Sequence, residues 1–109
     1  MYSTTYASPE EFERLNGAPR VHVLAAVPSG EREIDDCVHP DEQVIDDLQA
    51  SALAATSPAP ASRARVVTCA AAVGATAVRV VADQRFFDWE RGRTGYRFRD
   101  RVIATWPVP

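Results

Sequence analysis

Arg20-Val21-His22-Val23-Leu24-Ala25-Ala26-Val27 is the stretch of sequence that decides the fold. Successive side chains of a strand point to opposite faces, and here both sets are largely apolar. A strand that is apolar on both faces belongs inside a sheet rather than at its edge. Pro28-Ser29-Gly30 ends the run. The sequence therefore predicts a sheet with a neighbouring strand on each side of residues 20–27.

The segment that follows predicts an amphipathic helix at about residues 40–55. Pro40 suits the first helical position, and two acids follow it in the first turn, where the helix dipole favours negative charge. The apolar residues fall on one stripe at helical spacing: Val44, Ile45, Leu48, Ala52 and Ala55. A capping box that begins at Ser8 predicts a short N-terminal helix at about 9–15. The acidic residues 31–39 are expected to form a loop or an edge strand.

Residues 56–84 contain two kinds of signal. Residues 56–62 are rich in Pro, Ala and Ser and predict a surface loop. Residues 64–84 have enough Ala for a helix and enough Val for strands. Because Gly74 separates two runs of β-branched residues, a hairpin of Arg65–Ala72 and Thr76–Gln84 is favoured. A helix through 69–79 is the alternative.

The C-terminal segment predicts a second hairpin with a turn at Arg91–Thr94. In that register the aromatic residues pair across the strands, Trp89 with Tyr96 and Phe87 with Phe98. Two pairs of opposite charge form as well, Asp88 with Arg97 and Arg85 with Asp100. A shift of one residue would place aromatic residues opposite charged ones. The strand is expected to continue to Trp106.

Together these elements predict one α+β domain over residues 1–109. It has a mostly antiparallel sheet of four to five strands, one main helix and a short N-terminal helix. A chain of 109 residues with 46% apolar and 25% charged residues suits a single globular core. No run reaches about 18 apolar residues, and the first residues lack the features of a secretory signal. A cytoplasmic location, or a place in an assembled particle, is expected. Two distant cysteines then favour free thiols over one bridge.

Charge is divided unevenly along the chain. All twelve basic residues are arginine; residues 61–109 hold nine of them against four acids, and residues 1–60 hold three against eleven acids. Such asymmetry is typical of a polyanion-binding face or of two faces that pair with each other.

The candidate binding residues lie in the C-terminal hairpin. Arg97, Arg99 and Arg101 alternate, so a regular strand would project them from one face about 7 Å apart, which suits phosphate contacts. Their alternative role is a solvated face neutralised by acids of the same chain. The remaining candidates are turn arginines and large aromatic groups, the residue types enriched at interfaces: Arg91, Arg93, Phe86, Trp89 and Trp106.

Metal binding and catalysis receive weaker support. Cys37 and His39 would point the same way on an extended segment, and with His22 or Cys69 they would make a four-ligand zinc site. The spacing matches no strong zinc signature, so an acidic loop before a helix cap is favoured, and no cofactor or metal is expected. The same cysteines and histidines offer a nucleophile–base pair, but no catalytic motif accompanies them. The chain is therefore not predicted to be an enzyme.

The favoured function is a non-catalytic small subunit or adaptor that acts through protein–protein contacts, by self-association or with another protein. A phage or prokaryotic structural assembly is a typical setting for such a chain. The first alternative is a module that binds nucleic acid or another polyanion through the arginine-rich hairpin. The second is a small cytosolic enzyme or ligand binder. No contact with a membrane is expected.

Overall fold

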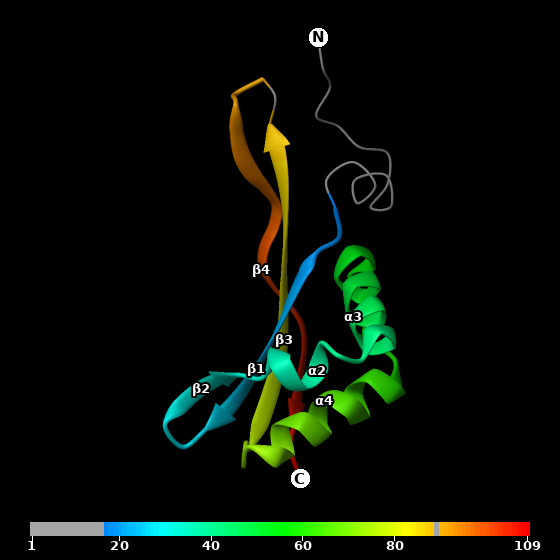
Figure 1. The fold of residues 1–109 in the computed structure, drawn as a ribbon, viewed down its shortest axis with the longest axis vertical. Helices are drawn as coiled ribbons and strands as arrows, with labels where there is room; N and C mark the ends of the chain where they lie inside the picture. Colours follow the sequence, from blue (N-terminus) through cyan, green and yellow to red (C-terminus); the bar gives the residue numbers. More distant parts are fainter. Residues whose placement is uncertain (1–16, 89) are drawn as a thin grey trace.

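The structure is a computed structural model and describes residues 17–88 and 90–109. Four antiparallel strands form one sheet in the order β2-β1-β3-β4 (Figure 1). The strands are β1 (Arg20–Val27), β2 (Gly30–Glu33), β3 (Ala77–Asp88) and β4 (Arg93–Pro107). The helices are α2 (Asp35–Val38), α3 (Glu42–Ala54) and α4 (Pro60–Ala72). The predicted α+β class with a four-stranded antiparallel sheet is confirmed. The predicted helix at 9–15 lies outside the described residues.

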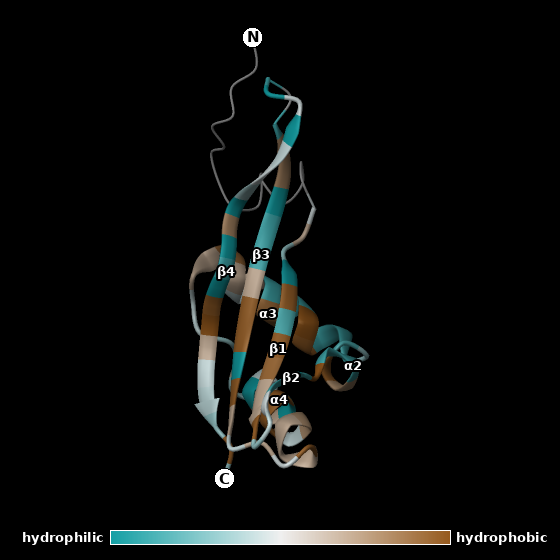
Figure 2. Ribbon diagram, turned by 90° about the vertical axis from the view of Figure 1, so that its left-hand side faces the viewer, coloured by the Kyte–Doolittle hydropathy of each residue, from teal (hydrophilic) through white to brown (hydrophobic). Residues whose placement is uncertain are grey.

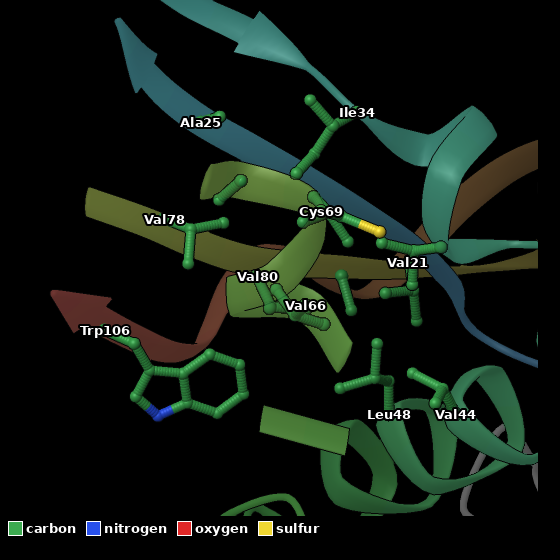
Figure 3. Close-up of a cluster of buried hydrophobic side chains, with 14 of the residues drawn as sticks. Val21, Ala25, Ile34, Val44, Leu48, Val66, Cys69, Val78, Val80 and Trp106 are labelled. Atoms are coloured by element: carbon green, nitrogen blue, oxygen red, sulfur yellow. The ribbon is translucent and has the colours of Figure 1, made fainter. Parts of the chain in front are cut away.

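The three described helices lie on one face of the sheet, and no described helix lies on the other. Figure 1 shows α2, α3 and α4 on the same side of the strands, and Figure 2 looks onto the opposite side of the sheet. The core lies between the two layers, where β3 residues such as Val78 and Val80 meet Leu48 of α3 and Val66 of α4 (Figure 3). All four side chains are fully buried. We call the side without a described helix the open face.

Strand β1 forms as predicted, over residues 20–27, between β2 and β3. Helix α3 also forms close to its predicted bounds. The side chain of Asp41 accepts a hydrogen bond from the Val44 backbone N–H at 3.3 Å, which satisfies one free donor of the first turn. The helix ends at Ala55, whose φ of 54° is left-handed. Residues 31–39, expected as a loop or an edge strand, form the end of edge strand β2 and the short helix α2.

Residues 60–72 form a helix, so the predicted strand Arg65–Ala72 is wrong and the loop is shorter than 56–62. Pro60 occupies the first turn of α4, where its missing N–H costs nothing. Val66, Cys69 and Ala70 follow at helical spacing and are buried against the sheet. This packing overrides the preference of Val and Thr for strands. Gly74, with φ of 72°, follows the end of the helix, and the second predicted strand forms as part of β3.

The β3–β4 pairing differs from the predicted register. The observed partners include Arg85 with Tyr96 and Phe87 with Thr94, and residues 89–92 connect the strands. Three register shifts interrupt the ladder. They account for the difference in length between β3 (12 residues) and β4 (15 residues). The extra residues all fall in β4, as β-bulges. The prediction assumed an uninterrupted ladder, so the expected pairing of Phe87 with Phe98 is wrong.

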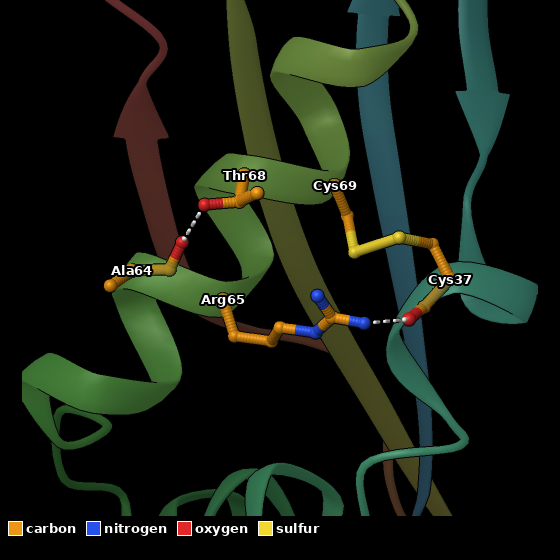
Figure 4. Close-up of a disulfide and its surroundings, with 5 residues drawn as sticks. All are labelled: Cys37, Ala64, Arg65, Thr68 and Cys69. Carbon is orange, nitrogen blue, oxygen red and sulfur yellow. Dashed lines mark hydrogen bonds between the residues drawn. A yellow bond between two sulfur atoms is a disulfide. The ribbon is translucent and has the colours of Figure 1, made fainter.

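Cys37 and Cys69 form a disulfide between α2 and α4, with their Cα atoms 5.9 Å apart (Figure 4). The prediction of free thiols is therefore wrong. The two residues are separated by 32 positions, and only the packing of α4 beside α2 brings them together. Arg65 supports the same contact, since its Nη2 donates to the Cys37 carbonyl at 3.2 Å. No helix in the described part of the chain is long and apolar enough to cross a membrane.

Candidate functional site

The open face carries the large apolar side chains that are most exposed. Phe87 and Tyr96 are each 41% exposed, and Val102 is 54% exposed. Alternate residues of β3, including Val80, are buried toward the helices, so Phe87 points to the open face. Tyr96 and Val102 are the register partners of Arg85 and Val81, which share that face with Phe87. One side of the sheet therefore presents an apolar surface that no described helix covers.

Two arginines flank the exposed tyrosine on this face. Arg85 is the cross-strand partner of Tyr96, and the guanidinium of Arg99 lies 4.9 Å from the centroid of the Tyr96 ring. Both arginines are exposed, and no carboxylate of the described residues forms an ion pair with either. We name Arg85, Phe87, Tyr96 and Arg99 the arm patch. It combines flat aromatic surface with guanidinium donors, a combination that suits contact with carboxylates or phosphates.

The predicted row of three arginines on one face does not form. Arg101 turns to the helix side, where its Nη1 donates to the Ala52 carbonyl at 3.0 Å and its guanidinium lies 4.1 Å from the Phe98 ring centroid. Arg97 also bonds within the chain, through Nη1 to Oε1 of Gln84 at 3.4 Å. The β4 bulges break the alternation on which the row depended. Only Arg99 of the three belongs to the arm patch.

The other predicted binding residues range from exposed to buried. Arg93 is exposed at the start of β4, while Arg91 lies in the turn with its Nε 3.6 Å from the Asp88 carboxylate. Phe86 is half-buried and packs on Gly95, where an added Cβ would come within 2.9 Å of its ring. Trp106 is only 9% exposed and belongs to the core, so its role as an exposed binding residue was predicted wrongly. Trp89 lies outside the described residues.

An acidic region lies on α2, α3 and the preceding edge strand. Residues 31–47 hold eight carboxylates and one arginine. Some of these acids have structural roles, as Asp47 does by accepting a hydrogen bond from the Ala59 N–H at 2.9 Å. Four exposed acids of this region form no side-chain hydrogen bond or ion pair within the described residues: Glu33, Asp36, Glu42 and Asp46. We name the last three, which lie on α2 and α3, the acidic patch.

One ion pair fastens edge strand β2 to the middle of the sheet. Arg79 donates from Nε and Nη2 to the two carboxylate oxygens of Glu31, at 2.6 and 2.8 Å. These hydrogen bonds hold the pKa of the Glu31 carboxyl below its usual value, and they raise the pKa of Arg79. The pair spans β1, because β2 and β3 are the outer neighbours of that strand. Arg79 is the one arginine in the first half of β3, and the ion pair gives it a structural role.

The residues expected to form a metal site or a catalytic pair are divided between two places. Cys37 and Cys69 are joined in the disulfide, so neither offers a thiolate ligand or nucleophile in this state. His22 and His39 instead meet at the carboxylate of Asp35, a residue that was not predicted to be functional. The sequence carries no local signal for this meeting, because 13 positions separate His22 from Asp35.

Comparison with known proteins found no matching family model, no similar curated protein and no similar solved structure. The arm patch, the acidic patch and the histidine–carboxylate cluster are therefore interpreted from their geometry and chemistry.

Proposed function

We propose that the protein is a non-catalytic subunit that assembles by placing the arm patch of one copy against the acidic patch of another. The observation that carries this proposal is the position of Tyr96 between Arg85 and Arg99 on the open face, where Tyr96 is 41% exposed. Exposed apolar surface bordered by polar groups is characteristic of interaction sites. Aromatic and arginine side chains are also the residue types that dominate interface energetics.

Charge supports a second copy as the partner. The β3–β4 arm, residues 84–101, holds six arginines against three acids, whereas residues 31–47 hold eight acids against one arginine. Complementary charges of this kind accelerate association and select the orientation in which two surfaces meet. The affinity of such a contact falls as salt is added, because salt screens the attraction between the two charged surfaces. The Debye length is about 8 Å at physiological ionic strength.

The proposed contact joins two different surfaces of the chain. When each pair of copies makes this contact once, the result is a ring or an open filament. When two copies make it reciprocally about a twofold axis, the result is a dimer. Assembly in either form depends on concentration and needs no catalytic group.

Light scattering coupled to size-exclusion chromatography tests the proposal directly. The protein is expected to form oligomers at low salt that dissociate as salt rises. Arg99→Glu is expected to produce monomers, and Asp46→Arg is expected to do the same. Mixing or combining the two changes should restore oligomers, because the charges are exchanged rather than lost. Arg20→Glu, an exposed arginine outside the arm, is the matched control and should leave assembly intact.

Two results would contradict self-association. The first is a protein that stays monomeric at every concentration and salt. The second is an oligomer that Arg99→Glu and Asp46→Arg leave unchanged. Tyr96→Ser adds an independent measure, since it removes apolar contact area without changing charge and should shorten the lifetime of the complex.

A polyanion is the second candidate partner, favoured by the same Arg85–Tyr96–Arg99 cluster. Bases of a single strand stack on exposed aromatic rings while arginines contact the phosphates. Fluorescence anisotropy with a labelled single-stranded oligonucleotide tests this function. If it is correct, Arg85→Gln and Arg99→Gln should each weaken binding and reduce its salt dependence. Oligonucleotide binding that is unaffected by both changes would exclude the arm patch as the site.

We infer that the disulfide and the predicted location point to different compartments. The predicted cytoplasmic location, or a place within an assembled particle, stays a prediction. The Cys37–Cys69 disulfide favours an oxidising environment, because cytosolic thiols are kept reduced. Rapid alkylation of thiols in intact cells, followed by mass measurement, distinguishes the two. An unalkylated protein is expected where the environment is oxidising, and two added labels are expected in the cytosol.

A further inference from the structure

The carboxylate of Asp35 is held in place at the point where β2 ends and α2 begins. Its Oδ1 accepts a hydrogen bond from the backbone N–H of Val23 at 2.7 Å. Its Oδ2 lies 3.1 Å from Nδ1 of His22, which projects from the neighbouring β1. The Asp35 side chain is 15% exposed and that of His22 is 43% exposed. One oxygen is thus used to position the carboxylate, while the other faces an accessible imidazole.

Glu33 completes a group of three possible metal ligands. The ligand atoms of His22, Glu33 and Asp35 all lie within 4.8 Å of one another. Two ligand atoms bound to one zinc ion at about 2.1 Å are separated by about 3.4 Å in tetrahedral geometry. The 3.1 Å between His22 Nδ1 and Asp35 Oδ2 is already close to this value. Glu33 is exposed at the end of β2, so its side chain can move the remaining distance.

We propose that His22, Glu33 and Asp35 bind a divalent transition metal ion, with Zn²⁺ as the preferred ion. A ligand set of one imidazole and two carboxylates suits Zn²⁺, whereas Mg²⁺ and Ca²⁺ use oxygen ligands almost exclusively. The negative charge of residues 31–47 favours any cation at this place. The site is separate from the arm patch and does not depend on the proposed self-association.

His39 lies beside the site but is not one of the proposed ligands. Its Nε2 is 3.8 Å from Asp35 Oδ2 but bonds to the Val21 carbonyl at 3.1 Å. A carbonyl oxygen accepts a hydrogen bond only from a nitrogen that carries a proton. Nε2 of His39 therefore carries a proton in this position and has no lone pair for a metal ion. Three protein ligands then leave one coordination position for water or for a donor from another molecule.

The disulfide anchors the element that carries the site. Cys37 lies between Asp35 and His39 in α2, and its bond to Cys69 ties this four-residue helix to the 13-residue α4. A helix of four residues is too short to be stable alone. Reduction is therefore expected to loosen α2, which links the redox state to the geometry of the metal site.

Isothermal titration calorimetry of tag-free oxidised protein with Zn²⁺ is the primary test. One ion per chain is expected, with no comparable heat from Mg²⁺. Glu33→Gln and His22→Asn should each lower the affinity by about tenfold or more. Glu90→Gln is the matched control, because it removes an exposed carboxylate that lies outside both the ligand set and the acidic patch. His39→Gln should retain binding, with a smaller loss than His22→Asn.

Nuclear magnetic resonance identifies the ligands independently of affinity. Zn²⁺ should shift the His22 imidazole nitrogen resonances strongly and those of His39 weakly. The amide spectrum of each variant shows whether it is folded before its affinity is interpreted. The proposal is overturned if Zn²⁺ binds no tighter than Mg²⁺. It is overturned equally if folded His22→Asn and Glu33→Gln proteins bind Zn²⁺ as the unchanged protein does.

Discussion

The guanidinium of Arg101 donates a hydrogen bond to the backbone carbonyl of Ala52 at 3.0 Å, and so joins β4 to the last turn of α3. The last four carbonyls of a helix have no partner within it. Arg101 supplies one, and its positive charge also suits the negative end of the helix dipole. A residue that the sequence pattern assigned to a binding row therefore holds the two layers together.

The first prediction separates this structural arginine from a surface one. Arg101→Gln should lower the free energy of unfolding by about 1.5–3 kcal/mol, the usual contribution of a hydrogen bond from a charged group. Arg99→Gln should change it by less than about 0.5 kcal/mol, because Arg99 is exposed. Urea denaturation of both variants under conditions where the protein is monomeric makes the comparison. Equal losses would show that Arg101 does not support the fold in the manner described.

The second prediction concerns the disulfide. Closing a loop of 32 residues is expected to stabilise the protein by about 3–4 kcal/mol through the lower entropy of the unfolded chain. The double variant Cys37→Ala and Cys69→Ala should lose about this amount in urea denaturation. Reductant should destabilise the natural chain similarly and leave the double variant unaffected. A reductant effect on the double variant would contradict this explanation.

The third prediction concerns the end of α3. Ala55 has φ of 54° and ψ of 44°, a left-handed conformation that is unfavourable for residues with a Cβ. Ala55→Gly should therefore raise the free energy of unfolding by about 0.5–1 kcal/mol. Ala54→Gly, one position earlier and still inside the helix, should lower it by a similar amount. Thermal denaturation of the two variants should thus give shifts of opposite sign.

The fourth prediction is a pH dependence from the Glu31–Arg79 pair. The folded-state pKa of Glu31 lies below its usual value of 4.5. Its contribution to stability is therefore present above the unfolded pKa and is lost as the pH falls through the folded one. Titration of the Glu31 carboxyl by nuclear magnetic resonance should show the lowered pKa. Arg79→Gln should return the pKa toward the usual value, and an unchanged pKa in that variant would assign the cause elsewhere.

The elements that depend on short-range pattern were predicted well. Residues 20–27 alternate two largely apolar faces, and a pattern of that kind has one solution, an internal strand. Helix α3 follows from its apolar stripe and the acids at its start. Helix α4 was missed, because Ala and β-branched residues are compatible with either structure until the sheet supplies a surface to pack on.

The arm patch was harder to predict from the sequence, because it too depends on tertiary packing. The charge division between the arm and residues 31–47 is visible in the sequence, and so is the wealth of arginine and aromatic residues. The bulges that select Arg99 for the open face and turn Arg101 to the helices are not visible. A bulge depends on which residues of β4 must meet β3 and the helix layer, and that requirement comes from packing.

The sequence by itself determined the α+β class, the internal strand at 20–27, a helix at about residues 40–55 and the separation of acidic and basic regions. These features rest on periodicity and local capping, which act within a few residues. Only the tertiary structure decided that Cys37 meets Cys69 and that His22 meets Asp35. It also decided that Arg99 lies on the open face, whereas Arg101 turns to the helices. Contacts between residues far apart in the chain depend on how the layers pack, and no local spacing encodes that.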